Sequence, residues 1–346
     1  MIKSIPTITK NKMTRPLLTI AVPTYNGAKT IKNLLDSILN QNDYRIEILV
    51  INNCSTDNTL QIVESYVDRL PNLRIINQQS NVGPDANFLD CFKKAEGKYV
   101  HLISDDDVYI EKSIEKILTV LSRSEDIALA YLQTVGFYGK YTGEKSCDQK
   151  EWNEHVDTFV TKDKKRFMVE AAHYWGFVSS FICLTDNFKS MDRPEQYFGT
   201  YWLQSYIHAF CAKGDNANMA VIAGPCIGAG RYININNFDS AMVDGVYYRK
   251  MLMFAYEVCG FNKKQLLSFW KKRLFMLTRH NFIKEKAIGI KKQSFKNLFK
   301  ITWKYPEAWI ILYPFAFVPS FICKAYNKFY RTKKQIVMDG VINRPE

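Results

Sequence analysis

The stretch Tyr-Val-His-Leu-Ile-Ser-Asp-Asp-Asp, residues 99–107, joins a short apolar run to three consecutive carboxylates. The apolar run predicts a buried strand over 99–103, and Asp105, Asp106 and Asp107 then lie where that strand ends. Three like charges repel one another, so a hard divalent cation such as Mg²⁺ or Mn²⁺ would relieve the cluster and could bridge it to a diphosphate. Acidic triplets also cap helices and form turns, so the residues before this stretch decide between the two interpretations.

Two more apolar runs come earlier in the chain, and both also end in polar residues. The runs over 17–22 and 47–51 predict buried strands, because apolar segments of this length bounded by turn formers are typical of such strands. Clusters of turn and cap formers follow them, at 23–27 and 52–59. Residues 31–39 repeat apolar side chains at helical spacing, so a helix is expected between the two strands.

Strand and helix alternate through this part of the chain. The remaining predicted elements are helices over 60–67, 88–95 and 110–121, a strand over 73–77, a turn at 81–84 and a helix stop at Gly97. The alternation predicts an α/β, Rossmann-like fold, in which a mostly parallel sheet is flanked by helices. Ligands bind beyond the carboxyl ends of the strands in such sheets, so three polar clusters at that edge predict a pocket. The Gly-x-Gly-x-x-Gly and Gly-Lys-Ser/Thr loops are absent, which excludes the standard dinucleotide and P-loop classes.

Four short motifs stand in order along these residues: Pro23-Thr24-Tyr25-Asn26, Asn52-Asn53-x-Ser55-x-Asp57-x-Thr59, Asn81-x-Gly83, and Gly97-x-Tyr99 leading to Ser104-Asp105-Asp106-Asp107. In order and spacing, over about residues 17–120, the sequence resembles an inverting family 2 glycosyltransferase. The resemblance implies the GT-A fold, a nucleotide-sugar donor and a divalent metal, Mn²⁺ or Mg²⁺. The Ser-Asp-Asp-Asp form and a later Phe-Gly-Thr-Tyr-Trp at 198–202 resemble the abequosyltransferase-like branch, which builds bacterial surface polysaccharides.

The resemblance implies that the first motif, residues 23–26, lies along the nucleotide base of the donor. Tyr25 could stack on the base, and the alternative is a tyrosine packed at a strand end. In the second motif, Asn52-Asn53 replaces the acidic pair with which the family hydrogen-bonds uracil. An amide both donates and accepts hydrogen bonds whereas a carboxylate only accepts, so the identity of the base stays open.

Three more polar residues are predicted to face the donor. Asp57 is a candidate partner for the ribose, and Asp85 and Asn87 lie where the family presents polar groups toward the donor. Helix capping is the alternative for all three, because each lies near a predicted helix start.

The acidic run is predicted to hold the metal. By resemblance, its last two positions, Asp106 and Asp107, are the best ligand candidates, with Asp105 close behind and also beside the donor. The cation would offset the charge that develops on the leaving nucleotide diphosphate.

Inversion also needs a general base that takes a proton from the acceptor hydroxyl. The resemblance implies a carboxylate of a Glu-Asp pair just before a Trp-containing helix, but residues 199–202 there read Gly-Thr-Tyr-Trp. The nearest acids, Asp192 and Glu195, are the predicted bases, with Asp186 and His208 as alternatives.

A glycine-containing segment, 224–237, is predicted to form a mobile loop over the diphosphate. Arg231 would supply its cation, because a guanidinium makes bidentate contacts with phosphate oxygens. A surface salt bridge is the alternative role for Arg231.

The chain has 346 residues and 47% hydrophobic content, enough for one large catalytic domain plus an appendage. Its charge is uneven, because residues 246–346 contain 21 Lys or Arg against 5 Asp or Glu, a balance of +16, whereas the whole chain carries +13. We therefore predict a polar tail at 1–16, a GT-A domain at 17–245 and a basic helical region at 246–346. The eight cysteines show no Cys-x-x-Cys spacing, which argues against a zinc or disulfide framework.

The C-terminal region is predicted to contain helices over 246–259, 263–284 and 292–304, followed by an uncharged run over 308–323. Sixteen uncharged residues with two prolines are short for a spanning helix, which needs about 20. Aromatic residues mixed with Lys and Arg favour an anchor on anionic lipid at the membrane surface. Nucleic-acid binding is the rival interpretation, and no RNA- or DNA-binding motif supports it.

Together these features predict a metal-dependent glycosyltransferase that moves a hexosyl or deoxyhexosyl group, with inversion, from a nucleotide sugar to a glycan carried on a polyprenyl diphosphate. It would act in O-antigen or capsule assembly, as a peripheral protein on the cytoplasmic face of the inner membrane. Two alternatives stay open. A nucleotidyltransferase could use a similar sheet, although it would need a glycine-rich basic loop near the first strand, and a non-catalytic scaffold could bind glycan or membrane.

Overall fold

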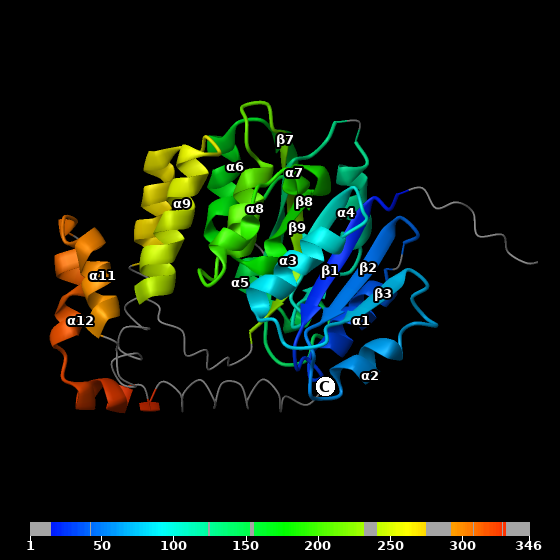
Figure 1. The fold of residues 1–346 in the computed structure, drawn as a ribbon, viewed down its shortest axis with the longest axis horizontal. Coiled ribbons are helices and arrows are strands. Elements are labelled where there is room, and N and C mark those ends of the chain that lie inside the picture. The colour runs from blue at the N-terminus through cyan, green and yellow to red at the C-terminus, as the bar shows by residue number, and fades with distance from the viewer. Residues whose placement is uncertain are drawn as a thin grey trace, which may run out of the picture.

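The computed structural model confirms an α/β fold built on one mixed sheet. It describes residues 15–41, 43–123, 125–152, 156–231, 241–274, 292–306, 308–326 and 328–329. Figure 1 shows the sheet near the centre of the molecule with helices packed against it, and the C-terminal helices along one flank.

The first third of the chain follows the predicted order of elements. These are β1 (Leu18–Thr24), α1 (Ile31–Leu39), β2 (Ile46–Asn52), α2 (Thr59–Glu64), β3 (Leu73–Asn77), α3 (Pro84–Lys94), β4 (Tyr99–Leu102), β5 (Val108–Tyr109) and α4 (Ser113–Leu121). α3 begins at Pro84 rather than at residue 88, because proline is favoured in the first turn of a helix and Gly83, with a φ of 86°, turns the chain into it. α4 begins later than predicted, because β5 first pairs with β9.

The middle of the chain adds elements that the apolar pattern had not indicated. They are β6 (Leu129–Phe137), α5 (Gln149–Trp152), β7 (Phe159–Thr161), α6 (Lys164–Ala171), η3 (Val178–Ser180), β8 (Phe181–Leu184), α7 (Thr185–Lys189), η4 (Pro194–Tyr197), α8 (Leu203–Cys211) and β9 (Met219–Gly230). The predicted loop over 224–237 is therefore wrong in its first part, since residues 224–230 belong to β9. Gly228 allows this pairing, because a Cβ there would lie 2.8 Å from Val108 Cγ2 in β5. Residues 232–237 lie outside the described residues.

The strands are ordered β3-β2-β1-β4-β8-β6-β9-β5, and β7 also pairs with β9. β1 runs parallel to β2 and β4, and β2 runs parallel to β3. β8 is antiparallel to both of its neighbours, β4 and β6, and β9 is parallel to β6. The carboxyl ends of β1, β2, β4 and β9 therefore lie at the same edge of the sheet, which we name the carboxyl edge.

Apolar side chains cover both faces of the sheet. Along β1, Leu18, Ile20 and Val22 belong to one hydrophobic core while Ala21 belongs to the other, as the alternation of a strand requires. α1, α2 and α4 bury side chains in the first core, and α3, α6, α8 and α9 do so in the second. The sheet is thus the middle layer of three.

The C-terminal region packs onto the second core. Its described elements are η5 (Ala241–Tyr247), α9 (Tyr248–Glu257), a helix over 263–274, α11 (Lys292–Thr302), η6 (Ala308–Leu312), α12 (Pro314–Phe317) and a helix over 320–326. Trp270, Leu298 and Tyr313 are buried in the same core as the strands, so this core crosses the division predicted at residue 245. The rest of the helix predicted over 263–284 lies outside the described residues. Within the described part of the chain, no helix has both the length and the hydropathy needed to cross a membrane.

Candidate active site

Three loops meet at the carboxyl edge. Thr24 closes β1, and its buried hydroxyl donates a hydrogen bond to a carboxylate oxygen of Asp105, which follows β4. The Thr24 carbonyl accepts a hydrogen bond from the backbone N of Asn53, just after β2, at 2.8 Å. The strand order thus brings together three motifs that lie far apart in the sequence.

The rest of the first motif surrounds this contact. Pro23 is buried within β1, while Tyr25 exposes 48% of its surface beyond the strand. Asn26 adopts a φ of 55°, in the left-handed region, and its side-chain oxygen accepts a hydrogen bond from Thr56 N at 2.8 Å. Tyr25 is therefore the member of this motif whose ring is open to a ligand.

Asn52 and Asn53 are buried and join neighbouring loops. Asn52 Nδ2 donates to Asn77 Oδ1, at the end of β3, at 2.7 Å. Asn53 Nδ2 donates to Asn81 Oδ1 at 3.0 Å, and Asn53 Oδ1 accepts from Val82 N at 2.9 Å. Both amides are thus engaged in hydrogen bonds that hold the loop after β3 against the end of β2.

Asp57 has the helix-capping contacts that were its alternative role. Its Oδ1 accepts a hydrogen bond from Thr59 N at 3.0 Å and another from the Thr59 hydroxyl. Its Oδ2 accepts from Ala28 N at 3.2 Å. The carboxylate therefore joins the start of α2 to the loop after β1.

Asp105 and Asp106 are half-buried neighbours at the centre of the edge. Ser104 Oγ donates to Asp106 Oδ1 at 2.5 Å. Burial raises the pKa of Asp105 to about 6, with the charge of Asp106 adding to the rise and the Thr24 hydrogen bond opposing it. Burial also raises the pKa of Asp106. Two partly desolvated carboxylates that repel each other are a donor set suited to a hard divalent cation.

Asp107 is fully buried and engaged within the protein. Its Oδ2 accepts a hydrogen bond from Ser179 Oγ at 2.5 Å, and its Oδ1 accepts from Gly230 N, at the end of β9, at 2.9 Å. Burial and the charge of Asp106 raise the pKa of Asp107 well above its usual range. Asp107 therefore ties the acidic loop to β9 and η3. Across the described residues, no group of three or more His, Cys, Asp or Glu side chains is arranged to hold a metal ion.

Asp85 lies in the first turn of α3, at the carboxyl edge. Its Oδ2 accepts a hydrogen bond from Gly199 N at 2.6 Å. Burial raises the pKa of Asp85, and this hydrogen bond opposes the rise. Gly199 belongs to the segment in which the family resemblance implies a carboxylate, so Asp85 brings a carboxylate to that segment from another part of the chain.

Asn87 is also buried in α3, and one of the two polar atoms of its amide forms a hydrogen bond. Its Nδ2 donates a hydrogen bond to Ile51 O at 3.2 Å. Its Oδ1 has no hydrogen-bond partner among the described residues. The amide thus spans from α3 to β2 and leaves one buried acceptor unsatisfied.

The predicted bases Asp192 and Glu195 lie away from the acidic loop. Glu195 Oε1 pairs with Lys93 Nζ at 2.5 Å, and this hydrogen bond lowers the pKa of Glu195. Lys93 is in the last turn of α3, about 12 Å along the helix from Asp85. Asp192 is exposed and pairs with Arg193 Nε at 3.1 Å. The pairing with Lys93 therefore places Glu195 away from the carboxyl edge, and the ion pair of Asp192 is with its neighbour in the sequence and not with the acidic loop.

Arg231 follows β9 and forms the salt bridges that were its alternative role. Its Nη1 lies 3.3 Å from Asp148 Oδ2, and its Nη2 contacts the Glu151 carboxylate. Its guanidinium also lies over the Tyr138 ring, 5.5 Å from the centroid. These contacts hold the guanidinium against β6 and α5.

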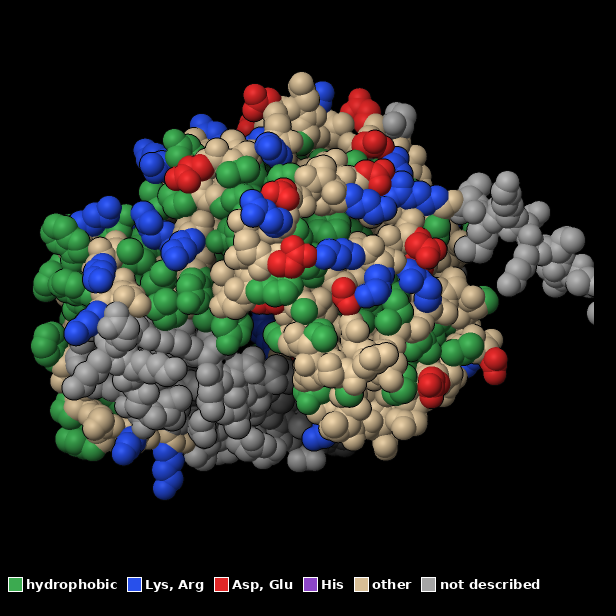
Figure 2. Space-filling model, viewed as in Figure 1, with side chains coloured by type: hydrophobic (Ala, Val, Ile, Leu, Met, Phe, Trp, Pro, Cys, Tyr) green, Lys and Arg blue, Asp and Glu red, His purple; other side chains and the backbone are tan. Residues whose placement is uncertain are grey.

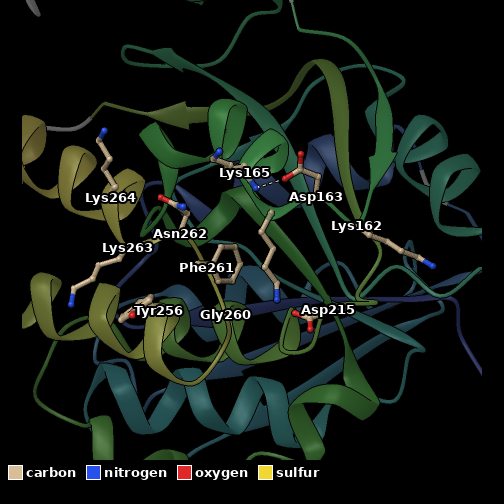
Figure 3. A pocket seen from close by; sticks show the side chains of 11 residues that line it. Lys162, Asp163, Lys165, Asp215, Tyr256, Gly260, Phe261, Asn262, Lys263 and Lys264 are labelled. Carbon is tan, nitrogen blue, oxygen red and sulfur yellow. Dashed lines mark hydrogen bonds between the residues drawn. The ribbon is translucent and has the colours of Figure 1, made fainter.

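A hollow of about 640 Å³ lies at the opposite edge of the sheet (Figure 3). Its basic lining residues are Lys162, Lys164, Lys165, Lys263 and Lys264. Asp215, which also lines it, precedes the amino end of β9, so the hollow lies away from the acidic loop. Lys164 Nζ is engaged there, because it donates to the carbonyl oxygens of Gly214 at 2.8 Å and Cys259 at 2.7 Å.

Two residues of the site were not predicted. Gly27 is required beside Asp105, because a Cβ there would lie 2.1 Å from Asp105 Oδ2. Gly27 follows the first motif directly, so the turn composition could have indicated it. Ser179 receives a hydrogen bond from Ser104 N at 2.9 Å and donates to Asp107. No local pattern marks Ser179, since only the fold brings it to the acidic loop.

Comparisons with known proteins agree with this geometry. The family model described as glycosyl transferase family 2 matches residues 19–181. Abequosyltransferase RfbV of Salmonella typhimurium is 26% identical over 212 residues, which cover 56% of this chain and 59% of RfbV. An uncharacterised glycosyltransferase of Mycoplasma pneumoniae is 34% identical over 104 residues, which cover 29% of this chain and 35% of that protein. The chain thus matches only part of the length of these relatives.

Solved structures establish the fold. The structure of Staphylococcus aureus TarS 1–349 in complex with UDP-GlcNAc has a TM-score of 0.59 and 18% identity, and the match covers 82% of this chain and 78% of that one. A mannosyltransferase of Pyrobaculum calidifontis, in complex with GDP-Man and Mn²⁺, has a TM-score of 0.50 and 13% identity over 91% of this chain and 87% of that one. The predicted GT-A fold is confirmed, and residues 19–181 of this chain form a glycosyl transferase family 2 domain.

Proposed function

We propose that this chain transfers a hexosyl or deoxyhexosyl group, with inversion, from a nucleotide-sugar donor to a lipid-linked glycan acceptor. The observation that carries the proposal is the junction of Thr24 with Asp105, where the first motif meets the acidic loop at the carboxyl edge. Open α/β sheets bind their ligands at this edge. The family 2 domain and the likeness to RfbV support a role in O-antigen or capsular polysaccharide assembly.

The donor base would lie along the loop after β1. Tyr25 offers an exposed ring for stacking. Hydrogen bonds of Asn26, Asn52, Asn53 and Asp57 hold the neighbouring loops together. The related structures hold UDP-GlcNAc in one case and GDP-Man in the other, so they support a nucleotide sugar without selecting its base.

Asp105 and Asp106 would hold Mn²⁺ or Mg²⁺, with Asp107 behind them. Oxygen ligands suit both cations. Burial raises the pKa of both half-buried carboxylates, and the charge of Asp106 adds to the rise at Asp105, so a cation would relieve the cost of their charge. Asp107 fixes the loop through Ser179 and Gly230, so its contribution would be to position the other two. When bound, the cation would supply charge stabilisation for the leaving diphosphate.

The acceptor hydroxyl would attack the anomeric carbon as the bond from that carbon to the diphosphate breaks, and its proton would pass to a general base. Asp192 and Glu195 were the predicted bases, and their distance from the acidic loop weakens that assignment. We infer that Asp85 takes this role. It lies at the carboxyl edge, its hydrogen bond to Gly199 reaches the expected segment, and burial raises its pKa toward the range of an effective base.

Asn87 and Arg231 complete the proposed donor site. The unsatisfied Oδ1 of Asn87 could accept a hydrogen bond from the donor or from a bound water. Arg231 would reach the diphosphate only by exchanging Asp148 and Glu151 for phosphate oxygens.

The acceptor would be a glycan on a polyprenyl diphosphate, presented at the cytoplasmic face of the inner membrane to a peripherally bound enzyme. The basic C-terminal region supports this location. Nucleic acid is not a proposed partner.

Donor binding tests the proposal. Calorimetric titration of the full chain with UDP-, GDP-, dTDP- and CDP-sugars, each with Mn²⁺, with Mg²⁺ and with chelator, is expected to give one metal-dependent donor. Asp106→Ala should abolish the metal-dependent part of that binding. Absence of binding to every donor under every metal condition would favour the non-catalytic scaffold. Formation of nucleoside triphosphate and sugar 1-phosphate from the donor and added pyrophosphate would favour a nucleotidyltransferase.

A further inference from the structure

Several large apolar side chains are exposed on the C-terminal helices. Phe317 exposes 84% of its surface, Ile310 76% and Phe321 70%. We name the following set the C-terminal apolar surface: Trp303, Trp309, Ile310, Phe317, Phe321 and Phe329. Large exposed apolar patches of this kind mark interaction sites rather than ordinary protein surface.

The helices that carry this surface are firmly packed on their other side. Leu298, Ala308, Tyr313 and Cys323 are buried. α11 approaches η5 closely, since a Cβ at Gly245 would lie 2.5 Å from Leu298 Cδ1. The helices that carry the exposed side chains are therefore packed on the core through their other side.

An aromatic cluster joins α11 to the residues that follow it. The Phe299 ring lies 5.2 Å from that of Tyr313, and Trp309 lies 4.9 Å from Tyr313. Trp309 Nε1 donates a hydrogen bond to Trp303 O at 2.7 Å. Trp309 is thus held by its ring contact with Tyr313 and by its indole hydrogen bond, while more than half of its surface stays exposed.

Lysines border the apolar surface. Residues 292–329 contain six Lys and one acidic residue, Glu307. The exposed lysines among the described residues are Lys296, Lys300, Lys304, Lys324 and Lys328. Figure 2 shows green and blue side chains together on the flank formed by the C-terminal helices, with no red among them.

We infer that the C-terminal apolar surface docks on an anionic lipid bilayer, with its aromatic side chains in the headgroup region and the bordering lysines against lipid phosphates. The inference deepens the proposed membrane location but does not require glycosyl transfer. Tryptophan, phenylalanine and lysine on one face are the composition of an interfacial surface. A nucleic acid would match the positive charge and could stack bases on exposed rings, but it would leave aliphatic side chains such as Ile310 without a partner, and a second copy would bring like charges together.

The orientation suits an acceptor carried in the membrane. In Figure 1, β1 and β2 run toward the lower edge of the view, which is their carboxyl edge, and the red C-terminal segment lies along the lower left. The red C-terminal segment and the open ends of β1 and β2 thus both lie toward the lower edge of that view. A lipid-linked sugar could then approach the acidic loop from the membrane to which the protein is bound.

Vesicle sedimentation of the purified full chain tests the inference. Vesicles of phosphatidylcholine alone are compared with vesicles that also contain phosphatidylglycerol, and strong binding is expected only to the second kind. Lys324→Ala with Lys328→Ala should weaken this binding roughly 20- to 30-fold, from the attraction of about two lysines to an anionic surface. Phe317→Ser with Phe321→Ser should weaken it at least about tenfold.

The matched control is Lys263→Ala with Lys264→Ala, which removes the same charge from the hollow at the opposite edge of the sheet. It should leave binding within about twofold of the native protein, and circular dichroism should show all variants folded. The inference would be overturned if this control lost as much vesicle binding as the other lysine variant. It would also be overturned if the native protein bound both vesicle types equally or bound neither. Self-association of the native protein that Phe317→Ser with Phe321→Ser abolishes while vesicle binding persists would overturn it as well. Donor titration without vesicles reports on the proposed function separately.

Discussion

At the residue scale, the acidic loop contains two kinds of carboxylate. Asp107 accepts hydrogen bonds from Ser179 and Gly230 while fully buried, whereas Asp106 is half-buried beside Ser104. Asp107→Ala should therefore lower the free energy of unfolding by about 3 kcal/mol, because two buried donors lose their acceptor. Asp106→Ala should change it by less than about 1 kcal/mol.

Urea unfolding of both variants measures this difference in stability. Donor titration in Mn²⁺ measures the effect of each substitution on donor binding. Asp106→Ala should lose metal-dependent binding while its unfolding midpoint stays near that of the native protein. Equal destabilisation by the two substitutions would contradict the division between a structural and a ligand-facing carboxylate.

Asp85 is the carboxylate that we propose as the general base. Asp85→Asn should lower kcat by about 100-fold or more, because the amide cannot take the proton of the acceptor hydroxyl. The carbonyl oxygen of the new amide can still accept from Gly199 N, so the loop contact is retained. Glu195→Gln removes only an exposed ion pair with Lys93 and should change kcat by less than about twofold.

Steady-state kinetics with a fixed donor distinguish the two carboxylates. The KM for the donor should change little in Asp85→Asn, since the substitution removes a proton acceptor and preserves shape. A large fall in kcat for Glu195→Gln, with Asp85→Asn near native, would restore the base predicted from the sequence.

At the scale of elements, Gly97 sets how closely α3 returns to β1. A Cβ there would lie 2.5 Å from Thr19 N and 2.8 Å from the Leu18 carbonyl carbon, both backbone atoms that cannot turn aside. Gly97→Ala should therefore lower the free energy of unfolding by about 2–3 kcal/mol, as overpacking does in a core. Glu96→Ala is the control, because it changes the neighbouring residue, whose exposed side chain has an ion pair with Arg74 at 3.6 Å, and it should cost less than about 1 kcal/mol.

Chemical denaturation of the Gly97→Ala and Glu96→Ala variants gives the comparison. Similar losses of stability in both would mean that the chain beside β1 relaxes around the added methyl group. Gly97 would then act as the helix stop that the sequence indicated and not as a point of close approach.

The N-terminal elements were predictable because their apolar runs end in turn formers. β1, β2 and β4 are central strands, and short apolar runs are typical of these. β9 was missed because residues 224–230 contain three glycines, which read as a loop, whereas the absent side chains let β5 and β6 pair on either side. The acidic loop was predicted from local sequence, but the contacts of Asp85 with Gly199 and of Asp107 with Ser179 depend on the whole fold.

At the scale of the molecule, the chain consists of two regions of opposite net charge. Residues 246–346 carry +16, and the remaining residues sum to −3. The acidic loop that would need a cation therefore lies in the weakly acidic part, while the lysines that would meet lipid phosphate lie in the other. This separation would keep the basic region from competing with a metal ion for the same carboxylates.

The packed interior also makes stability depend on pH. His208 is fully buried on α8 against the rings of Phe92 and Phe181, and burial lowers its pKa to about 3. The unfolded chain binds a proton at this histidine near its ordinary value of 6.5, so the folded state loses stability as the pH falls below 6.5. By linkage this one group contributes a loss of about 2 kcal/mol between pH 8 and pH 5.

His208→Leu should remove that loss. Asp105 opposes it in the native protein, since burial raises the pKa of its carboxyl to about 6 and protonation then favours the folded state. Because Asp105 contributes equally in both proteins, the readout is a double difference: the stability of His208→Leu minus that of the native protein, measured by urea unfolding at pH 5 and at pH 8. The difference should be about 2 kcal/mol larger at pH 5. Equal differences at the two pH values would mean that His208 is protonated in the folded state, and its unpartnered ring nitrogens would then have to be hydrated inside the core.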